Sequence, residues 1–216
     1  AKGYPYAAKR PPSGTDYYET FNRQNVTLVD ISNDPIEEIT PTGLRTTSRE
    51  LEFDAIVFAT GFDSSTGALL RMEIEGRDGL TLSEKWKEAP LTNFGLSTAG
   101  FPNLFMIMGP QTPFANIPTC IEENVDWIAS CIQHMQKTGA TTCESTDEGE
   151  QRWTSHSQDV AGLLVPTKNE TVSTWYNGGN VEGKNRAVAV YFGGANEYFR
   201  ATRESVENGY EGFVLR

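Results

Sequence analysis

The sequence lacks several features that would assign it to a familiar class of protein. It has no apolar run of about 18 residues, the length at which a membrane-spanning helix becomes plausible. Basic residues are in deficit, with 18 Lys and Arg against 29 Asp and Glu among 216 residues and a net charge of −11. That balance argues against non-specific binding to nucleic acid and against docking on an anionic membrane.

Histidine and cysteine are also scarce. There are two His residues and three Cys residues, and Cys120, Cys131 and Cys143 have neither metal-binding nor redox-motif spacing. We therefore expect no metal site, and reduced thiols in a cytoplasmic protein. The first residues, AKGYPYAAKRPP, have no apolar segment of the kind found in signal peptides, and they include no initiator Met.

What the sequence does contain is typical of a folded α/β protein. Apolar residues make up 38% of the chain, enough for one large domain or for parts of two. The runs at 55–59, 103–108 and 187–194 resemble strands buried on both faces, which usually belong to parallel sheets. A further strand is expected at 25–31, and a hairpin at 35–47 around Pro41-Thr42-Gly43.

Helical periodicity is clearest at 118–137. Apolar residues there are spaced by four, three, four and three positions, at Ile121, Val125, Ile128, Ile132 and Met135. Pro118 suits the first turn and Gly139 the end. Further helices are expected at 17–24, 145–163 and 195–209, with a loop at about 165–185.

Two glycine turns follow predicted strands, at Gly61 and Gly109. Ligands of open α/β sheets bind at the carboxyl ends of strands, and glycine permits close approach of the backbone. Ordinary turn glycines explain the pattern equally well. The helix start at 116–119 can hold a phosphate or the anionic edge of a flavin, or it can be a simple capped terminus.

Two loop motifs are also candidates for binding. Lys9 and Arg10 place adjacent cations in an acidic chain, where they can hold an anion or simply be solvated. Trp175 begins a Trp-Tyr pair in a glycine-rich loop, which fits either a mobile clamp or a surface loop pinned by a buried Trp. None of these motifs is decisive alone.

Their order along the chain, however, resembles the C-terminal part of the Baeyer–Villiger monooxygenases, in particular the cyclohexanone and phenylacetone monooxygenase group. The resemblance covers essentially the whole chain. It is carried by Tyr4-Pro5-x-x-x-Lys9-Arg10, Asp16-Tyr17-Tyr18-Glu19-x-Phe21-Asn22-Arg23, Asn25-Val26-x-Leu28-Val29-Asp30, Phe58-Ala59-Thr60-Gly61-Phe62-Asp63, Gly100-Phe101-Pro102-Asn103-Leu104-Phe105, Gly109-Pro110, Trp175-Tyr176-x-Gly178-x-Asn180-x-x-Gly183-Lys184 and Gly209-Tyr210-x-Gly212-Phe213.

The resemblance implies an enzyme that uses FAD, NADPH and O₂ to convert a ketone to an ester or lactone. It implies that Arg10 is the active-site arginine that stabilises anionic oxygen intermediates. It further implies that Lys9 contacts the 2′-phosphate of NADP and that Trp175 closes over NADP.

The same resemblance implies two further groups of residues. On the FAD side are Thr60, Gly61, Gly109, Gln111, Asn116 and Ile117. Substrate contacts are expected from Phe114 and Ile117.

The family's two GxGxxG motifs and its FxGxxxHxxxWP fingerprint are not found in the chain. We therefore expect incomplete Rossmann-like domains: the last part of an NADP domain at 1–60, the returning part of an FAD domain at 61–144, and a helical C-terminal region at 145–216. The N-terminal half of the enzyme would be the partner, and the chain alone would be inactive. An N- or S-hydroxylating flavin monooxygenase and a non-catalytic α/β binding module remain alternatives.

Overall fold

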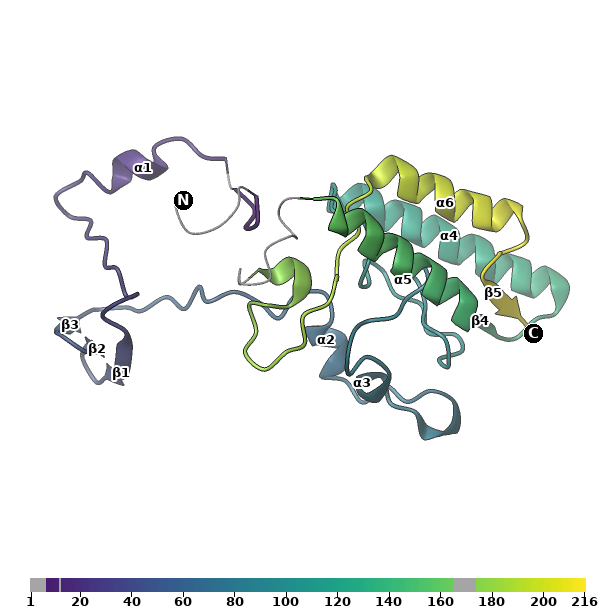
Figure 1. Ribbon diagram of the computed structural model, residues 1–216, viewed down its shortest axis with the longest axis horizontal. Helices are drawn as coiled ribbons and strands as arrows, with labels where there is room; N and C mark the ends of the chain where they lie inside the picture. The colour runs from purple at the N-terminus through teal and green to yellow at the C-terminus, as the bar shows by residue number, and fades with distance from the viewer. Residues whose placement is uncertain (1–6, 12, 165–173) are drawn as a thin grey trace. The chain divides into compact units, whose positions relative to one another are not determined.

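The computed structural model describes residues 7–11, 13–164 and 174–216 of the chain (Figure 1). These residues form two compact units. The smaller unit comprises the described residues within 11–61, and the larger comprises those within 1–10 and 62–216. The predicted division at 1–60, 61–144 and 145–216 concerns places within a larger enzyme and stays a prediction.

The smaller unit is built on the predicted hairpin, which is confirmed. β1 (Ile36–Thr40) pairs antiparallel with β2 (Gly43–Thr46), and β3 (Glu50–Glu52) adds a third antiparallel strand beside β2. A side chain at Gly43 would collide with the backbone of β3, which explains glycine at the turn. The predicted helix at 17–24 is only one turn long, α1 (Tyr17–Thr20).

Two strands predicted in this unit are wrong. Residues 25–31 and 55–59 have no assigned strand in the described structure. The apolar run at 55–59 is largely exposed, with Val57 at 87% and Phe58 at 68% exposure. A strand exists only when a neighbour satisfies its backbone groups. No described residue does so here, although the composition is strand-like.

In the larger unit the strongest predicted helix is confirmed as α4 (Ile117–Thr138). Asn116 caps its first turn by accepting a hydrogen bond from the Thr119 amide at 3.4 Å, and Pro118 occupies the first turn. Gly139 ends the helix in the left-handed conformation at φ 77°. The start and the end predicted for this helix from Pro118 and Gly139 are therefore confirmed.

The buried face of α4 coincides only in part with the row of regularly spaced apolar residues, which shares Met135 with it. The buried residues are Cys120, Asn124, Trp127, Cys131 and Met135. By contrast, Val125 and Ile132 are 43% and 41% exposed. The amide of Asn124 donates to the Tyr198 hydroxyl at 2.7 Å, which satisfies a polar group inside the core.

Two further helices were also predicted correctly. α5 (Asp147–Gly162) is capped by Thr146, and α6 (Ala195–Glu207) lies alongside α4 (Figure 1). β4 (Cys143–Ser145) and β5 (Phe213–Leu215) form a short antiparallel ribbon. The main core lies among these elements and contains Phe94, Leu96, Trp127, Cys131, Met135, Cys143, Trp153, Tyr191, Tyr198, Tyr210 and Phe213.

The other two predicted buried strands, at 103–108 and 187–194, are also absent as strands. The second makes only an isolated parallel bridge, between Tyr191 and Pro113. The remaining elements are the short α2 (Gly67–Leu70), η1 (Arg77–Gly79), α3 (Leu82–Lys85) and η3 (Trp175–Asn177). A second apolar cluster, Leu82, Trp86, Phe101 and Met106, supports this part of the unit.

Candidate active site

A pocket of about 280 Å³ lies at the start of α4, entirely within the larger unit. Its volume is near the lower end for small-molecule sites, so it fits a ring-sized group rather than a whole dinucleotide. The lining is mainly apolar with one cation and a few hydroxyls. The lining residues are Arg10, Ser64, Ser65, Met108, Gly109, Thr112, Pro113, Phe114, Ala115, Ile117, Trp175, Ala189 and Val190.

Phe114 is the centre of an aromatic cluster in this pocket. Its ring centroid lies 6.2 Å from that of Trp175, 5.4 Å from that of Tyr176 and 5.7 Å from that of Phe192. The guanidinium carbon of Arg10 lies 5.5 Å from the Phe114 centroid, within range of a cation–π contact. Arg10, the one cation among the described lining residues, is therefore held against an aromatic face.

The loop before α4 is fixed by backbone hydrogen bonds to residues 189–191. The Gln111 amide donates to the Ala189 carbonyl at 2.9 Å, and the Phe114 amide donates to the Tyr191 carbonyl at 2.8 Å. In return the Tyr191 amide donates to the Thr112 carbonyl at 2.9 Å. The apolar run at 187–194, wrongly predicted as a regular strand, therefore supports the wall of the pocket.

The buried side chain of Gln111 stabilises this loop through hydrogen bonds. It has φ 67°, a left-handed conformation that costs energy for a residue other than glycine. Its side-chain oxygen accepts from the hydroxyls of Thr92 at 2.7 Å and Thr154 at 3.1 Å, and its amide nitrogen donates to the Pro90 carbonyl at 3.0 Å. The side chain is 1% exposed and positions the loop.

The segment that carries Trp175 is attached to the rest of the unit. The Ala189 amide donates to the Tyr176 carbonyl at 3.0 Å, which joins this segment to the wall of the pocket. Lys184 forms an ion pair with Asp63, and the Asn180 side chain donates to the Phe62 carbonyl at 3.0 Å. The expected mobile loop at about 165–185 falls partly outside the described residues, at 165–173.

The electrostatics of the pocket depend on Arg10. Its side chain is exposed and has no ion pair among the residues that the structure describes. Burial raises the pKa of the nearby Tyr176 hydroxyl, and the positive charge of Arg10 opposes that rise. The pocket is thus positive on one side and apolar on the others, which suits an anionic oxygen beside a flat ring.

The structure brings together five residues that the sequence analysis selected: Arg10, Gly109, Phe114, Ile117 and Trp175 all line the pocket. Five others do not line it, and one of them is Gln111, whose buried side chain bonds to Thr92, Thr154 and Pro90. Lys9 is an exposed neighbour of Arg10, and Asn116 caps α4. Thr60 and Gly61 lie in the smaller unit.

Sequence reasoning missed several lining residues. Ser64 and Ser65 follow the Thr60-Gly61-Phe62 segment, and Thr112 and Val190 come from the two hydrogen-bonded segments. Ser65 has φ 64°, which marks a tight turn that composition alone does not reveal. Only the pairing of residues 111–114 with 189–191 brings Val190 to the pocket, and no sequence motif encodes it.

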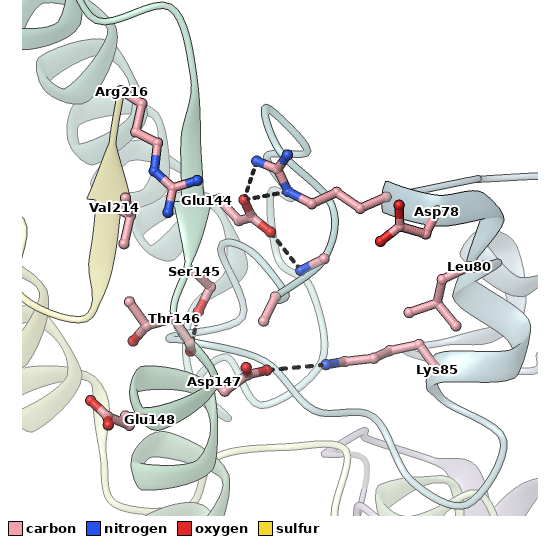
Figure 2. A pocket seen from close by; sticks show the side chains of 13 residues that line it. Asp78, Leu80, Lys85, Glu144, Ser145, Thr146, Asp147, Glu148, Val214 and Arg216 are labelled. Atoms are coloured by element: carbon pink, nitrogen blue, oxygen red, sulfur yellow. Dashed lines mark hydrogen bonds and ion pairs between the residues drawn. The ribbon is translucent and has the colours of Figure 1, made fainter.

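A larger hollow of about 700 Å³ lies elsewhere in the unit, between η1, α3, β4 and the start of α5 (Figure 2). Its principal charges are already paired. Arg77 binds the Glu144 carboxylate at 2.6 Å, and Glu144 also accepts from the Gly100 amide at 2.8 Å. Lys85 binds the buried Glu150 at 2.6 Å. These contacts indicate a structural role, and no predicted site residue lines this hollow.

Two further features of the described residues bear on the kind of site. Within the described ranges, no group of three or more His, Cys, Asp or Glu side chains is arranged to hold a metal ion. No helix among the same residues is long and apolar enough to cross a membrane.

Comparison with known proteins gives sequence relatives for nearly the whole chain, although no family model matches it. The chain is 42% identical over 208 residues to a Baeyer–Villiger monooxygenase of Pseudooceanicola batsensis, covering 96% of this chain and 38% of that protein. It is also 42% identical over 209 residues to a phenazine N-monooxygenase of Lysobacter antibioticus, again covering 96% and 38%.

Solved structures of monooxygenases also have a similar fold over nearly the whole chain. Cyclohexanone monooxygenase from Rhodococcus sp. Phi1 bound to NADP⁺ matches with a TM-score of 0.92 and 39% identity, covering 97% of this chain and 39% of that one. OTEMO in complex with FAD and NADP matches with a TM-score of 0.90 and 37% identity, covering 100% and 39%.

The comparisons first define a class: the chain has the fold of part of the FAD- and NADP-binding monooxygenases. Within that class it is related to the Baeyer–Villiger monooxygenases, and the resemblance predicted from its motifs is confirmed. The chain spans about two-fifths of the length of these relatives.

Proposed function

We propose that the protein containing this chain is a Baeyer–Villiger monooxygenase, which uses FAD, NADPH and O₂ to insert one oxygen atom beside a ketone carbonyl. The chain would be its C-terminal part, and the N-terminal half would complete both dinucleotide sites. The observation that carries this proposal is the meeting of Arg10, Phe114 and Trp175 at one apolar pocket. A cytoplasmic location is part of the proposal, supported by the three free thiols.

The described residues fit the reactive ends of the two cofactors. The pocket offers a guanidinium, aromatic faces and the start of a long helix, which suit a planar ring and an anionic oxygen. When bound, FAD would activate oxygen and NADPH would supply the reducing electrons. Gly109, Gln111, Asn116 and Ile117 are proposed for the FAD side, with Gln111 acting through the loop that it positions. Thr60 and Gly61 are proposed for the FAD side on the family resemblance alone.

Arg10 is the proposed catalytic residue. Its guanidinium would hold negative charge that develops on oxygen, by donating hydrogen bonds from a fixed planar fork. Phe114 fixes the position of that fork from one side. Arg10 is exposed in this chain, so such a donor would be worth several kcal/mol to a transition state once the rest of the enzyme and the bound reactants exclude water from the pocket.

The remaining residues would bind and enclose the reactants. Lys9, next to Arg10, is proposed to contact the 2′-phosphate of NADP, and Trp175 to cover NADP. Phe114 and Ile117, which are 38% and 53% exposed, are proposed to contact an apolar ketone. Their exposure leaves apolar surface for a substrate to cover.

N-hydroxylation is the second candidate, because one relative of equal identity is a phenazine N-monooxygenase. Product analysis of the complete protein separates the two. We expect a lactone from a cyclic ketone, with NADPH consumed in proportion, and no N-oxide from a phenazine. An N-oxide without any lactone would replace the first proposal by the second, and the absence of both products would contradict both.

A further inference from the structure

Cys131 and Cys143 form a close pair of thiols inside the larger unit. Their Sγ atoms lie 3.5 Å apart, and both side chains are buried, at 0% and 1% exposure. Cys131 belongs to α4, and Cys143 is the first residue of β4. The pair therefore joins two elements that no backbone hydrogen bond between them connects among the described contacts.

This spacing is close to what a disulfide requires. A disulfide has its sulfur atoms about 2.05 Å apart, so the two Sγ atoms must approach by about 1.5 Å. The Cys143 amide donates to the Asn103 side chain at 2.9 Å, which fixes the position from which its thiol points at α4.

We propose that Cys131 and Cys143 are a modification site, which a two-electron oxidant of the peroxide class converts to an intramolecular disulfide between α4 and β4. The Cys131 thiolate attacks one peroxide oxygen and becomes a sulfenic acid, while the other oxygen leaves as water. The Cys143 sulfur then attacks the sulfenic sulfur and expels a second water. In total, two thiols and one hydrogen peroxide give one disulfide and two waters.

The shared hydrogen bond acts on the two thiols in opposite directions. It lowers the pKa of the Cys131 thiol. The same bond, together with burial, raises the pKa of Cys143. These directions favour Cys131 as the first nucleophile, and first attack by Cys143 gives the same disulfide with the same balance. Cys120, in contrast, has its pKa raised by burial and has no thiol partner in the described structure.

Access for a small oxidant comes from the short ribbon of β4 and β5. Each strand has three residues, and among the described strands each pairs with the other alone, so opening the ribbon and the bonds from Cys143 to Asn103 costs less than global unfolding. Cys131 lies 14 residues beyond Ile117, or about 21 Å along the helix. A disulfide would therefore fix the far end of the helix whose start lines the pocket, without touching the pocket.

The test treats the complete, purified protein with hydrogen peroxide and then blocks the remaining thiols under denaturing conditions. Trypsin cleaves after Lys137 and so separates Cys131, in peptide 88–137, from Cys143, in peptide 138–152. We expect the two peptides to be linked, with the loss of two hydrogen atoms, and to separate on reduction. Both peptides recovered unlinked, at a peroxide dose that oxidises exposed methionines, would overturn the proposal.

Peptide 88–137 also contains Cys120, so variants complete the test. Cys120→Ser should retain the linked peptide, whereas Cys131→Ser and Cys143→Ser should each abolish it. The Cys120→Ser result alone remains decisive if either of the other variants fails to fold. A link that persists in Cys131→Ser, or that is lost in Cys120→Ser, would assign the disulfide to Cys120 and contradict the pair. The result is independent of the proposed monooxygenase activity.

Discussion

The guanidinium of Arg10 lies against the ring of Phe114, with 5.5 Å between its central carbon and the ring centroid. Phe114 in turn contacts Trp175, Tyr176 and Phe192. The Phe114 side chain therefore links the guanidinium of Arg10 to three aromatic residues that lie more than 60 positions after Phe114 in the sequence. The position of Arg10 depends on that link more than on any ion pair among the described residues.

Replacing Phe114 should therefore weaken catalysis through Arg10. A cation–π contact is worth about 0.5–2 kcal/mol, so we expect Phe114→Ala to lower kcat/KM of the complete enzyme by about 3- to 30-fold. Phe114→Tyr, which keeps the aromatic face, should retain most of the activity. Steady-state kinetics with a cyclic ketone measure the change. Phe62→Ala is a control, because that side chain is 89% exposed. Equal rates for Phe114→Ala and the control would contradict the link.

Gln111→Ala should destabilise the protein by about 2–4 kcal/mol. The substitution removes three buried hydrogen bonds, those from the Thr92 and Thr154 hydroxyls and that to the Pro90 carbonyl, and it keeps the unfavourable backbone conformation. Urea unfolding measures the loss. Gln133→Ala, on the exposed face of α4, should change stability by less than about 0.5 kcal/mol.

Gln111→Gly separates the loss of the side-chain hydrogen bonds from the cost of the left-handed backbone conformation. Glycine adopts φ 67° without strain, so it should recover up to about 1 kcal/mol relative to Gln111→Ala. If both substitutions were as mild as Gln133→Ala, the hydrogen bonds of Gln111 would have no measurable role in holding the loop.

The contact between Arg77 and Glu144 should make stability depend on pH (Figure 2). The hydrogen bond from Arg77 holds the pKa of Glu144 below its ordinary value of 4.5. A carboxylate with a lowered pKa in the folded state stabilises the protein above its ordinary pKa. That stabilisation is lost as the pH falls through the lowered value. Glu144→Gln should therefore be less stable than the parent at pH 7, by about 1 kcal/mol.

The difference between Glu144→Gln and the parent should shrink as the pH falls below 4.5, because the parent's carboxyl then also becomes neutral. Urea unfolding at pH 7 and at the lowest pH where the fold persists gives both values. A constant difference across that range would show that charge is not what Glu144 contributes.

The ion pair between Lys184 and Asp63 should hold the Trp175 segment in place. Both side chains are partly exposed, at 20% and 33%, so we expect a modest coupling of about 0.5–1 kcal/mol in a double-mutant cycle. If the segment covers NADP, as proposed, Lys184→Ala should raise KM for NADPH by several-fold with little change in kcat. Arg45→Ala, which breaks a surface pair with Glu38, is the control. An unchanged KM would separate this ion pair from cofactor binding.

The helices could be predicted from the sequence because their determinants are local. Asn116, Pro118 and Gly139 mark the ends of α4, and apolar residues recur with helical spacing between them. The buried face was nevertheless displaced by about one position. Asn124 is buried because Tyr198 and the Met108 amide satisfy it, and neither partner is near it in sequence.

The strands could not be predicted in the same way. Val57 and Phe58 have strand-forming side chains, but a strand also needs a hydrogen-bonded neighbour, which local sequence does not specify. The hairpin at β1 and β2 succeeded because its partner follows immediately after the turn.

The roles of the site residues stay predictions, and the structure shows only which of them share a pocket. Arg10 and Trp175 were selected on the family resemblance, whereas Ser65 and Val190 reach the pocket only through tertiary pairing. Gln111 was selected for cofactor contact, and in the structure its side chain is satisfied by Thr92, Thr154 and Pro90. Residue type shows which chemistry a side chain can perform. Only the fold shows whether that side chain lines the pocket or already has its hydrogen-bond partners elsewhere.

The most direct test of the central claim compares flavin reduction with lactone formation in the Arg10→Ala variant of the complete enzyme. With NADPH, O₂ and a cyclic ketone, we expect flavin reduction to remain measurable and lactone formation to fall by at least about 100-fold. Arg200→Ala, on the surface of α6, controls for general loss of charge. Lactone formation by Arg10→Ala at the rate of that control would contradict the assignment of Arg10 as the catalytic residue.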